Sequence, residues 1–177
     1  MNCRASCVVR RAWCVGVILA LIRALTYAAL FIGAFLVFIP GRILARVGIS
    51  PVAATGPGAV AGLVIVVLGL ALAIACVLTF AVIGKGTPAP FDPPRQLVIA
   101  GPYRYVRNPM YIGAGLALFG AAIFYRSTAL ALYATVFLVI THLFVMLYEE
   151  PHLRRVFGQS YEAYLRTVHR WVPTWRS

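Results

Sequence analysis

The chain has 177 residues, 62% of them hydrophobic, and its mean hydropathy is +0.90. A soluble domain of this length does not need so much apolar surface, so the composition predicts an all-α integral membrane protein and excludes a soluble fold. The formal net charge is +12, but the arginines lie mostly at the ends of apolar runs. This is the pattern of membrane topology, so we do not expect nucleic-acid binding.

The first apolar run follows three arginines, Arg4, Arg10 and Arg11, and continues to Ile39. It has no convincing small-residue cleavage site, so we interpret it as an uncleaved transmembrane helix and not as a secretory signal. Arg23 is expected to lie one turn inside the bilayer and to reach back to the headgroups. Pro40-Gly41 is expected to end this helix, and residues 43–47 are a candidate for a separate interfacial helix.

The second apolar run, residues 59–83, is free of charge. Gly62, Gly69 and Cys76 recur in it at seven-residue steps, and small residues on one face permit close helix packing. Residues 84–108 then form a proline-rich connection, which we expect to be an ordered loop. No histidine lies near the N-terminal cysteines, and no metal site is predicted.

The third and fourth apolar runs are separated by Arg126-Ser127 and predict an antiparallel hairpin. The third begins at Asn108-Pro109, where the asparagine is expected to cap the helix, and spans about 17 residues or roughly 25 Å. The fourth, residues 128–148, spans about 21 residues or roughly 31 Å and ends in Glu149-Glu150. The tail predicts two short amphipathic helices that are broken at Gly158, with arginines such as Arg170 facing outward.

Four spans would place most of the cationic residues on one side of the membrane, with only Arg42, Arg46 and Arg126 on the other. The asymmetry predicts that both termini are cytoplasmic and that the protein lies in the cytoplasmic (inner) membrane. We expect a single membrane domain over residues 1–177, with the first two spans in 14–83 and the binding region in 84–177.

The hairpin would bring Arg104, Arg107 and Asn108 beside Glu149 and Glu150. The helix N-terminus and the arginines favour an anion, and the glutamates favour an ammonium group or ribose hydroxyls. Stacking faces would come from three tyrosines, Tyr103, Tyr105 and Tyr111. Structural ion pairs that fix the loop would give the same pattern, and charge alone leaves both interpretations open.

His142 lies seven residues before Glu149, about 10 Å deeper on a helix. A functional role and a hydrogen-bonded packing role are both open for a histidine inside a span. His152 and His169 lie near arginines and are expected to be solvated.

Four segments of the chain form a pattern in order and spacing. They are Gly101-Pro102-Tyr103-Arg104-Tyr105-Val106-Arg107-Asn108-Pro109-Met110-Tyr111, Tyr148-Glu149-Glu150-Pro151-His152-Leu153, Phe157-Gly158-Gln159-Ser160-Tyr161-Glu162-Ala163-Tyr164 and Arg170-Trp171-Val172-Pro173. This pattern resembles the isoprenylcysteine carboxyl methyltransferase and phospholipid methyltransferase superfamily. The resemblance covers roughly the C-terminal half of the chain. It implies binding of S-adenosylmethionine and a lipid or other hydrophobic acceptor that enters from the bilayer. The cofactor-binding residues that it implies are Gly101, Tyr103, Arg104, Arg107, Asn108, Pro109, Tyr111, Glu149 and Glu150.

The resemblance assigns the catalytic roles to Arg107, Glu149 and Glu150. Asn108 stands where the family has histidine, and asparagine cannot act as a general base. Because adjacent residues point about 100° apart on a helix, we expect one glutamate, Glu149, to face the cofactor. The other, Glu150, would pair with an arginine of the loop or with Arg154.

The predicted activity is methyl transfer to a carboxylate or to an amine, and the sequence leaves both open. A membrane reductase of the sterol-reductase type, which would use NADPH, is an alternative. A non-catalytic membrane scaffold is a second alternative. Binding of S-adenosylmethionine, of NADPH or of neither distinguishes the three.

Overall fold

The computed structural model describes Ile22, Thr26 and residues 29–49, 56–84 and 97–174. Every regular element in these ranges is helical, which confirms the all-α prediction. Three helices are long and apolar enough to cross a membrane: Ala29–Val47, Pro57–Thr79 and Thr128–Phe157. A shorter apolar helix, Pro109–Phe124, is the fourth. The protein is an all-α membrane protein.

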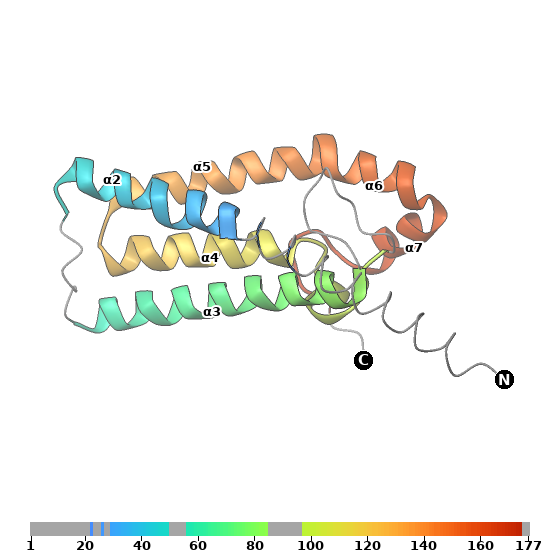
Figure 1. Ribbon diagram of the computed structural model, residues 1–177, viewed down its shortest axis with the longest axis horizontal. Helices are drawn as coiled ribbons and strands as arrows, with labels where there is room; N and C mark the ends of the chain where they lie inside the picture. Colours follow the sequence, from blue (N-terminus) through green and yellow to red (C-terminus); the bar gives the residue numbers. More distant parts are fainter. Residues whose placement is uncertain (1–21, 23–25, 27–28, 50–55, 85–96, 175–177) are drawn as a thin grey trace, which may run out of the picture.

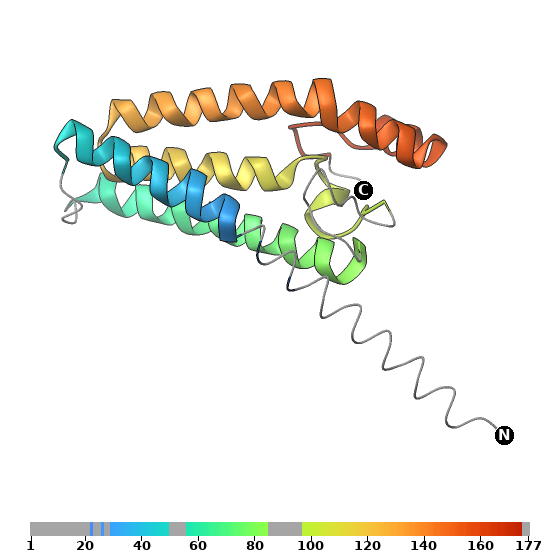
Figure 2. The same ribbon diagram turned by 45° about the horizontal axis from the view of Figure 1, so that its top comes forward.

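Three helices form the body of the bundle, with α4 (Pro109–Phe124) between α3 (Pro57–Thr79) and α5 (Thr128–Phe144), as Figures 1 and 2 show. The first helix, composed of a π-helical segment η1 (Ile32–Phe38) and α2 (Ile39–Val47), packs against α5 and α4. The outward faces carry exposed large apolar side chains, such as Leu63 and Leu132. Such surfaces are suited to lipid.

Small residues let α3 and α4 approach closely. A Cβ atom added to Gly69 would lie 2.5 Å from the carbonyl oxygen of Gly113, and one added to Gly62 would lie 2.7 Å from that of Gly120. Cys76, on the same face, is fully buried. The predicted small-residue packing face of the second span is confirmed, and it fixes the position of the N-terminus of α4.

The first helix does not end at Pro40-Gly41, so that prediction was wrong. The helix continues through this pair to Val47 and ends at Gly48, whose φ of +73° is left-handed. Pro40 lies in the first turn of α2, directly after the π-helical segment. At this junction the regular hydrogen-bond ladder is already interrupted, so a residue without an amide hydrogen is tolerated there. Residues 43–47 therefore belong to the first helix and are not a separate interfacial helix.

The α4–α5 hairpin forms as predicted. The connection at residues 125–127 contains Arg126 with a φ of +50°, and the Ser127 hydroxyl accepts a hydrogen bond from the Leu130 amide at the start of α5. α5 continues through a π-helical segment η4 (Val145–Glu149) into α6 (Glu150–Phe157). The two predicted tail helices are α6 and α7 (Gln159–Thr167), and they meet at Gly158.

Several predictions fall outside the described residues. They concern the N-terminal cysteines and arginines, Arg23, and the proline-rich part of the connection. Of that connection the structure describes residues 97–108, which contain the 3-10 helix η3 (Gly101–Arg104). We call residues 97–108 the site loop.

Candidate active site

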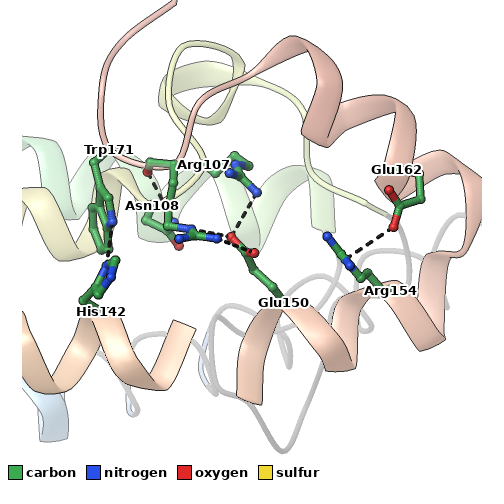
Figure 3. Close-up of polar contacts among 8 residues, drawn as sticks. Arg107, Asn108, His142, Glu150, Arg154, Glu162 and Trp171 are labelled. Carbon is green, nitrogen blue, oxygen red and sulfur yellow. Dashed lines mark hydrogen bonds and ion pairs between the residues drawn. The ribbon is translucent and has the colours of Figure 1, made fainter. Parts of the chain in front are cut away.

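The polar residues gather at one end of the bundle, where the site loop, the α5–α6 junction and the tail meet (Figure 3). Glu150 is the centre of this group. Its carboxylate accepts hydrogen bonds at 2.8 Å from Nε and Nη2 of Arg170, and at 2.9 Å from Nη1 of Arg107. The Glu150 side chain is only 9% exposed. A buried carboxylate held by two guanidinium groups has its position fixed on both sides.

The prediction that Glu150 pairs with an arginine of the site loop is confirmed, because its partner there is Arg107. The alternative partner, Arg154, was wrong. Arg154 pairs instead with Glu162 of α7 at 3.3 Å, in an exposed contact. The second partner, Arg170, was expected to face outward, and that prediction was also wrong. The tail folds back over the bundle end, which turns this arginine toward Glu150. The hydrogen bond to Glu150 raises the pKa of Arg170.

The tail is tied to the site loop by backbone contacts. The Arg107 amide donates to the carbonyl of His169 at 3.0 Å, and the Thr174 amide donates to the carbonyl of Tyr105 at 2.8 Å. Asn108 donates its side-chain amide to the carbonyl of Arg170 at 3.3 Å. We call residues 168–174 the C-terminal clamp. It holds the site loop in place over the end of α4.

Asn108 does not cap α4 with its side chain, contrary to the prediction. Its amide is used by the clamp, because the backbone of residue 170 passes within hydrogen-bond distance. Asn108 is nevertheless at the N-cap position, and Pro109 begins the helix as expected. Both residues are buried. Their role here is to join the loop, the helix and the clamp.

Glu149 points to a different environment from that of Glu150. Its carboxylate accepts a hydrogen bond at 3.2 Å from the hydroxyl of Tyr111, in the first turn of α4. Glu149 forms no ion pair with the described residues, whereas Glu150 has two arginines. The adjacent glutamates therefore differ as predicted in their arginine contacts.

Buried tyrosines surround the glutamates. Tyr103 packs against Cys76 and Val98, and burial, the Cys76 thiol and the Glu149 carboxylate raise its pKa. Burial and the Glu150 carboxylate raise the pKa of Tyr161 to about 12, against the opposing charge of Arg107. The phenols are therefore neutral hydrogen-bonding groups at physiological pH.

The remaining predicted site residues lie at the rim of the group or support it. Gly101 has a φ of +56°, and a Cβ atom there would lie 2.8 Å from the Thr79 hydroxyl, so this position packs the loop against α3. Arg104 is exposed, with its guanidinium 5.3 Å from the centre of the Tyr105 ring. The structure does not bring Arg104 to the glutamates by any contact among the described residues.

Sequence reasoning missed three contributors to this region. Tyr164 donates its hydroxyl to the carbonyl of Tyr103 at 2.6 Å, which secures α7 to the site loop. Trp171 donates its indole N–H to Nδ1 of His142 at 3.0 Å, so the packing role left open for His142 is the one observed. Arg170 and Trp171 belong to the segment Arg170-Trp171-Val172-Pro173, which was one of the four segments behind the family resemblance. That resemblance was the one sequence signal that could have pointed to a role for these two residues.

Two buried nitrogens, Nε of Arg107 and Nε2 of His152, have no hydrogen-bond partner in the described structure. His152 is partly buried, so the expectation that it is solvated was wrong. Buried donors or acceptors without partners are costly and mark places where a ligand or water completes the set. Nε of Arg107 and the Glu149 carboxylate offer complementary groups for a small zwitterionic ligand.

Comparison with known proteins assigns this arrangement to a family. The phospholipid methyltransferase family matches residues 58–160, more than half of the chain. The match covers α3, the site loop, the hairpin and both glutamates. The chain therefore belongs to the phospholipid methyltransferase family, which confirms the predicted superfamily.

The similar curated proteins are fungal. The phosphatidylethanolamine N-methyltransferase of Talaromyces marneffei is 31% identical over 70 residues, which are 40% of this chain and 7% of the relative. That of Sordaria macrospora is 34% identical over 70 residues with the same coverage, and that of Ajellomyces capsulatus is 28% identical over 86 residues. The chain thus spans less than a tenth of the length of these relatives. No solved structure matches the chain significantly.

Proposed function

We propose that the protein transfers a methyl group from S-adenosylmethionine to the amine of a membrane phospholipid. The observation that carries the proposal is that Arg107 and Glu149, at the same end of the bundle, both keep hydrogen-bonding capacity that the described residues do not use. Arg107 has a buried Nε without a partner among the described residues, and Glu149 has a carboxylate without an arginine. Family membership favours a phospholipid acceptor, and the names of the relatives favour an amine over a carboxylate.

The residues at the site fit S-adenosylmethionine in charge. The free Nε of Arg107 can donate to the carboxylate of the cofactor, and Glu149 can accept from its ammonium group or its ribose hydroxyls. Tyr111 orients Glu149 through their hydrogen bond. When bound, the cofactor supplies an activated methyl group on a sulfonium. Displacement at that carbon needs alignment above all, so a rigid site has the largest effect on rate.

Glu150 has a positioning role in this proposal. Its three bonds to Arg107 and Arg170 fix the direction of the Arg107 side chain. The clamp holds the site loop at the same end of the bundle through its backbone hydrogen bonds. We assign cofactor binding to residues 84–177 of the single membrane domain, whose described loop, hairpin and tail contribute these groups.

The experiment compares Glu149→Gln with the parent in detergent or in vesicles. We measure S-adenosylmethionine binding by calorimetry and the transfer of labelled methyl groups to vesicles that contain phosphatidylethanolamine. Loss of a ligand-facing carboxylate should lower the methylation rate by at least about a hundredfold, since correct orientation is lost. Exposed Glu162 provides a control, because Glu162→Gln removes an equal charge far from the proposed ligand.

If Glu149→Gln methylates at the parent rate, the assignment of the site is wrong. Binding of NADPH in place of S-adenosylmethionine by the parent would support the reductase alternative. Binding of neither cofactor would support the scaffold alternative.

A further inference from the structure

His152 is a partly buried histidine that the proposed cofactor site leaves unused. Its Nε2 is buried and has no hydrogen-bond partner in the described part of the chain. Depending on the tautomer, this imidazole nitrogen is a hydrogen-bond donor or an acceptor. Burying either one without a partner is energetically costly. We therefore expect a group from outside the chain to form a hydrogen bond with Nε2 of His152.

The location of His152 connects it to Glu149 and to the bilayer. It lies three residues after Glu149 and four after Tyr148, and residues at these spacings are neighbours on a helix surface. The rings of Tyr148 and His152 are parallel, with an interplanar angle of 1° and 6.1 Å between centroids. Tyr148 is 49% exposed and lies in η4, which continues the apolar α5. His152 thus lies beside the cofactor-facing glutamate and next to a lipid-accessible ring.

We propose that His152 and Tyr148 form the acceptor subsite and that Nε2 of His152 takes the proton from the ammonium headgroup. This proposal rests on the proposed function. An ammonium nitrogen has no lone pair, so the N–H bond must break first, and its electrons remain on nitrogen while the proton moves to Nε2. The lone pair then forms the N–C bond to the methyl carbon, and the C–S electrons leave with sulfur as the neutral thioether. The proton on His152 is later lost to water.

Other residues at the site are poorer candidates for this step. Asn108 cannot accept a proton, and its amide is used by the clamp. The Glu150 carboxylate is taken up by two arginines. Glu149 is assigned to the cofactor in the proposed function and also accepts a hydrogen bond from Tyr111. An aromatic ring at the lipid boundary attracts a cation, so Tyr148 is suited to the entering headgroup.

The charged groups around His152 come from its own helix and from α7. They are Glu149 and Glu150 before it, Arg154 and Arg155 after it, and Glu162 and Arg166 on α7, which packs against α6. Glu150 is paired with Arg107 and Arg170, and Arg154 with Glu162. Because His152 takes part in none of these ion pairs, the effect of its substitution on activity can be interpreted without the loss of an ion pair.

The test compares the parent with His152→Gln, using the full chain in phosphatidylcholine vesicles that contain phosphatidylethanolamine. Arg155→Gln, at an exposed position on the same helix, is the matched control. We expect His152→Gln to bind S-adenosylmethionine like the parent and to methylate at least about tenfold more slowly near pH 7. The methylation rate of His152→Gln should approach that of the parent as the pH is raised toward the pKa of the acceptor amine. At such a pH the amine loses its proton to water and does not need the histidine as a base.

A structural role for His152 predicts a different result. In that case the loss would persist at every pH or would be accompanied by weaker cofactor binding, and either outcome would overturn the proposal. An unchanged rate and pH profile would overturn it as well. A parent that fails to bind S-adenosylmethionine would refute the proposed function itself, which is a separate readout from the acceptor assay.

Discussion

Replacement of Glu150 by glutamine tests whether the bundle end depends on its ion-pair network. The substitution keeps the size of the side chain but removes its charge, and it turns one acceptor into an amide that faces the donors of Arg170. Three bonds of 2.8–2.9 Å are affected. Breaking one partner of a buried ion pair costs about 3–5 kcal/mol. The side chains of Arg107 and Arg170 are 13% and 27% exposed, so water can partly solvate them after the change.

We therefore expect a loss at the lower end of that range, about 3 kcal/mol. For a chain of this length, each kcal/mol lowers Tm by about 2–4 °C, which gives a decrease of about 6–12 °C. The measurement is a thermal melt of the purified protein in detergent, followed by circular dichroism. The expected loss requires no ligand, so it is independent of the proposed activity.

Glu162→Gln is the matched control for this prediction. The Arg154–Glu162 pair has side chains that are 54% and 48% exposed, and exposed pairs contribute about 0–1 kcal/mol. The double variant Glu150→Gln with Arg170→Gln should recover part of the loss, because one uncompensated guanidinium is removed. If Glu150→Gln melts within the range of Glu162→Gln, the network does not hold the bundle end together and the reasoning fails.

Three further predictions concern packing, the clamp and orientation. Gly69→Ala should cost about 1–3 kcal/mol, since its Cβ would lie 2.5 Å from a backbone oxygen of Gly113, whereas Gly58→Ala, which meets nothing within 4 Å, should not destabilise; melting curves compare them. Trp171→Phe replaces the indole with a smaller aromatic ring that has no N–H donor for His142, and we expect a loss of at least about 1 kcal/mol in the same assay. A cysteine placed at Ser177 should be labelled only from the cytoplasmic side, given the arginine asymmetry, and labelling from the outside would contradict the predicted topology.

The helical hairpin and its polar end could be predicted because they depend on local patterns. Apolar runs with a two-residue break form an antiparallel pair, and the ends of such a pair must be adjacent. Glycines at seven-residue steps on α3 predicted its packing face, because Gly62 and Gly69 recur on one side of a helix. These inferences needed only the period of the helix and the sign of the charges.

The missed features depend on where a chain segment goes after its last regular element. Whether Arg170 faces outward or inward is decided by the path of the clamp, which is set by backbone bonds between residues more than 60 positions apart. The same path gives Asn108 an alternative to capping. The continuation of the first helix through Pro40 depends on a π-helical segment, which has no clear sequence pattern.

The division between Glu149 and Glu150 explains why a membrane protein keeps so costly a group of charges at one end. A carboxylate that faces a ligand cannot also have its position fixed by arginines, since those arginines would satisfy it before the ligand arrives. Glu150 has the structural role and forms an ion pair with Arg107. The adjacent Glu149 has a hydrogen bond to the neutral hydroxyl of Tyr111, which is weaker than an ion pair with arginine. Because the two residues share one helix, fixing Glu150 also limits the movement of Glu149. On the proposed function, the ion pairs therefore serve to position the carboxylate that faces the cofactor, and their energetic cost is offset by the packing of α6, α7 and the clamp around them.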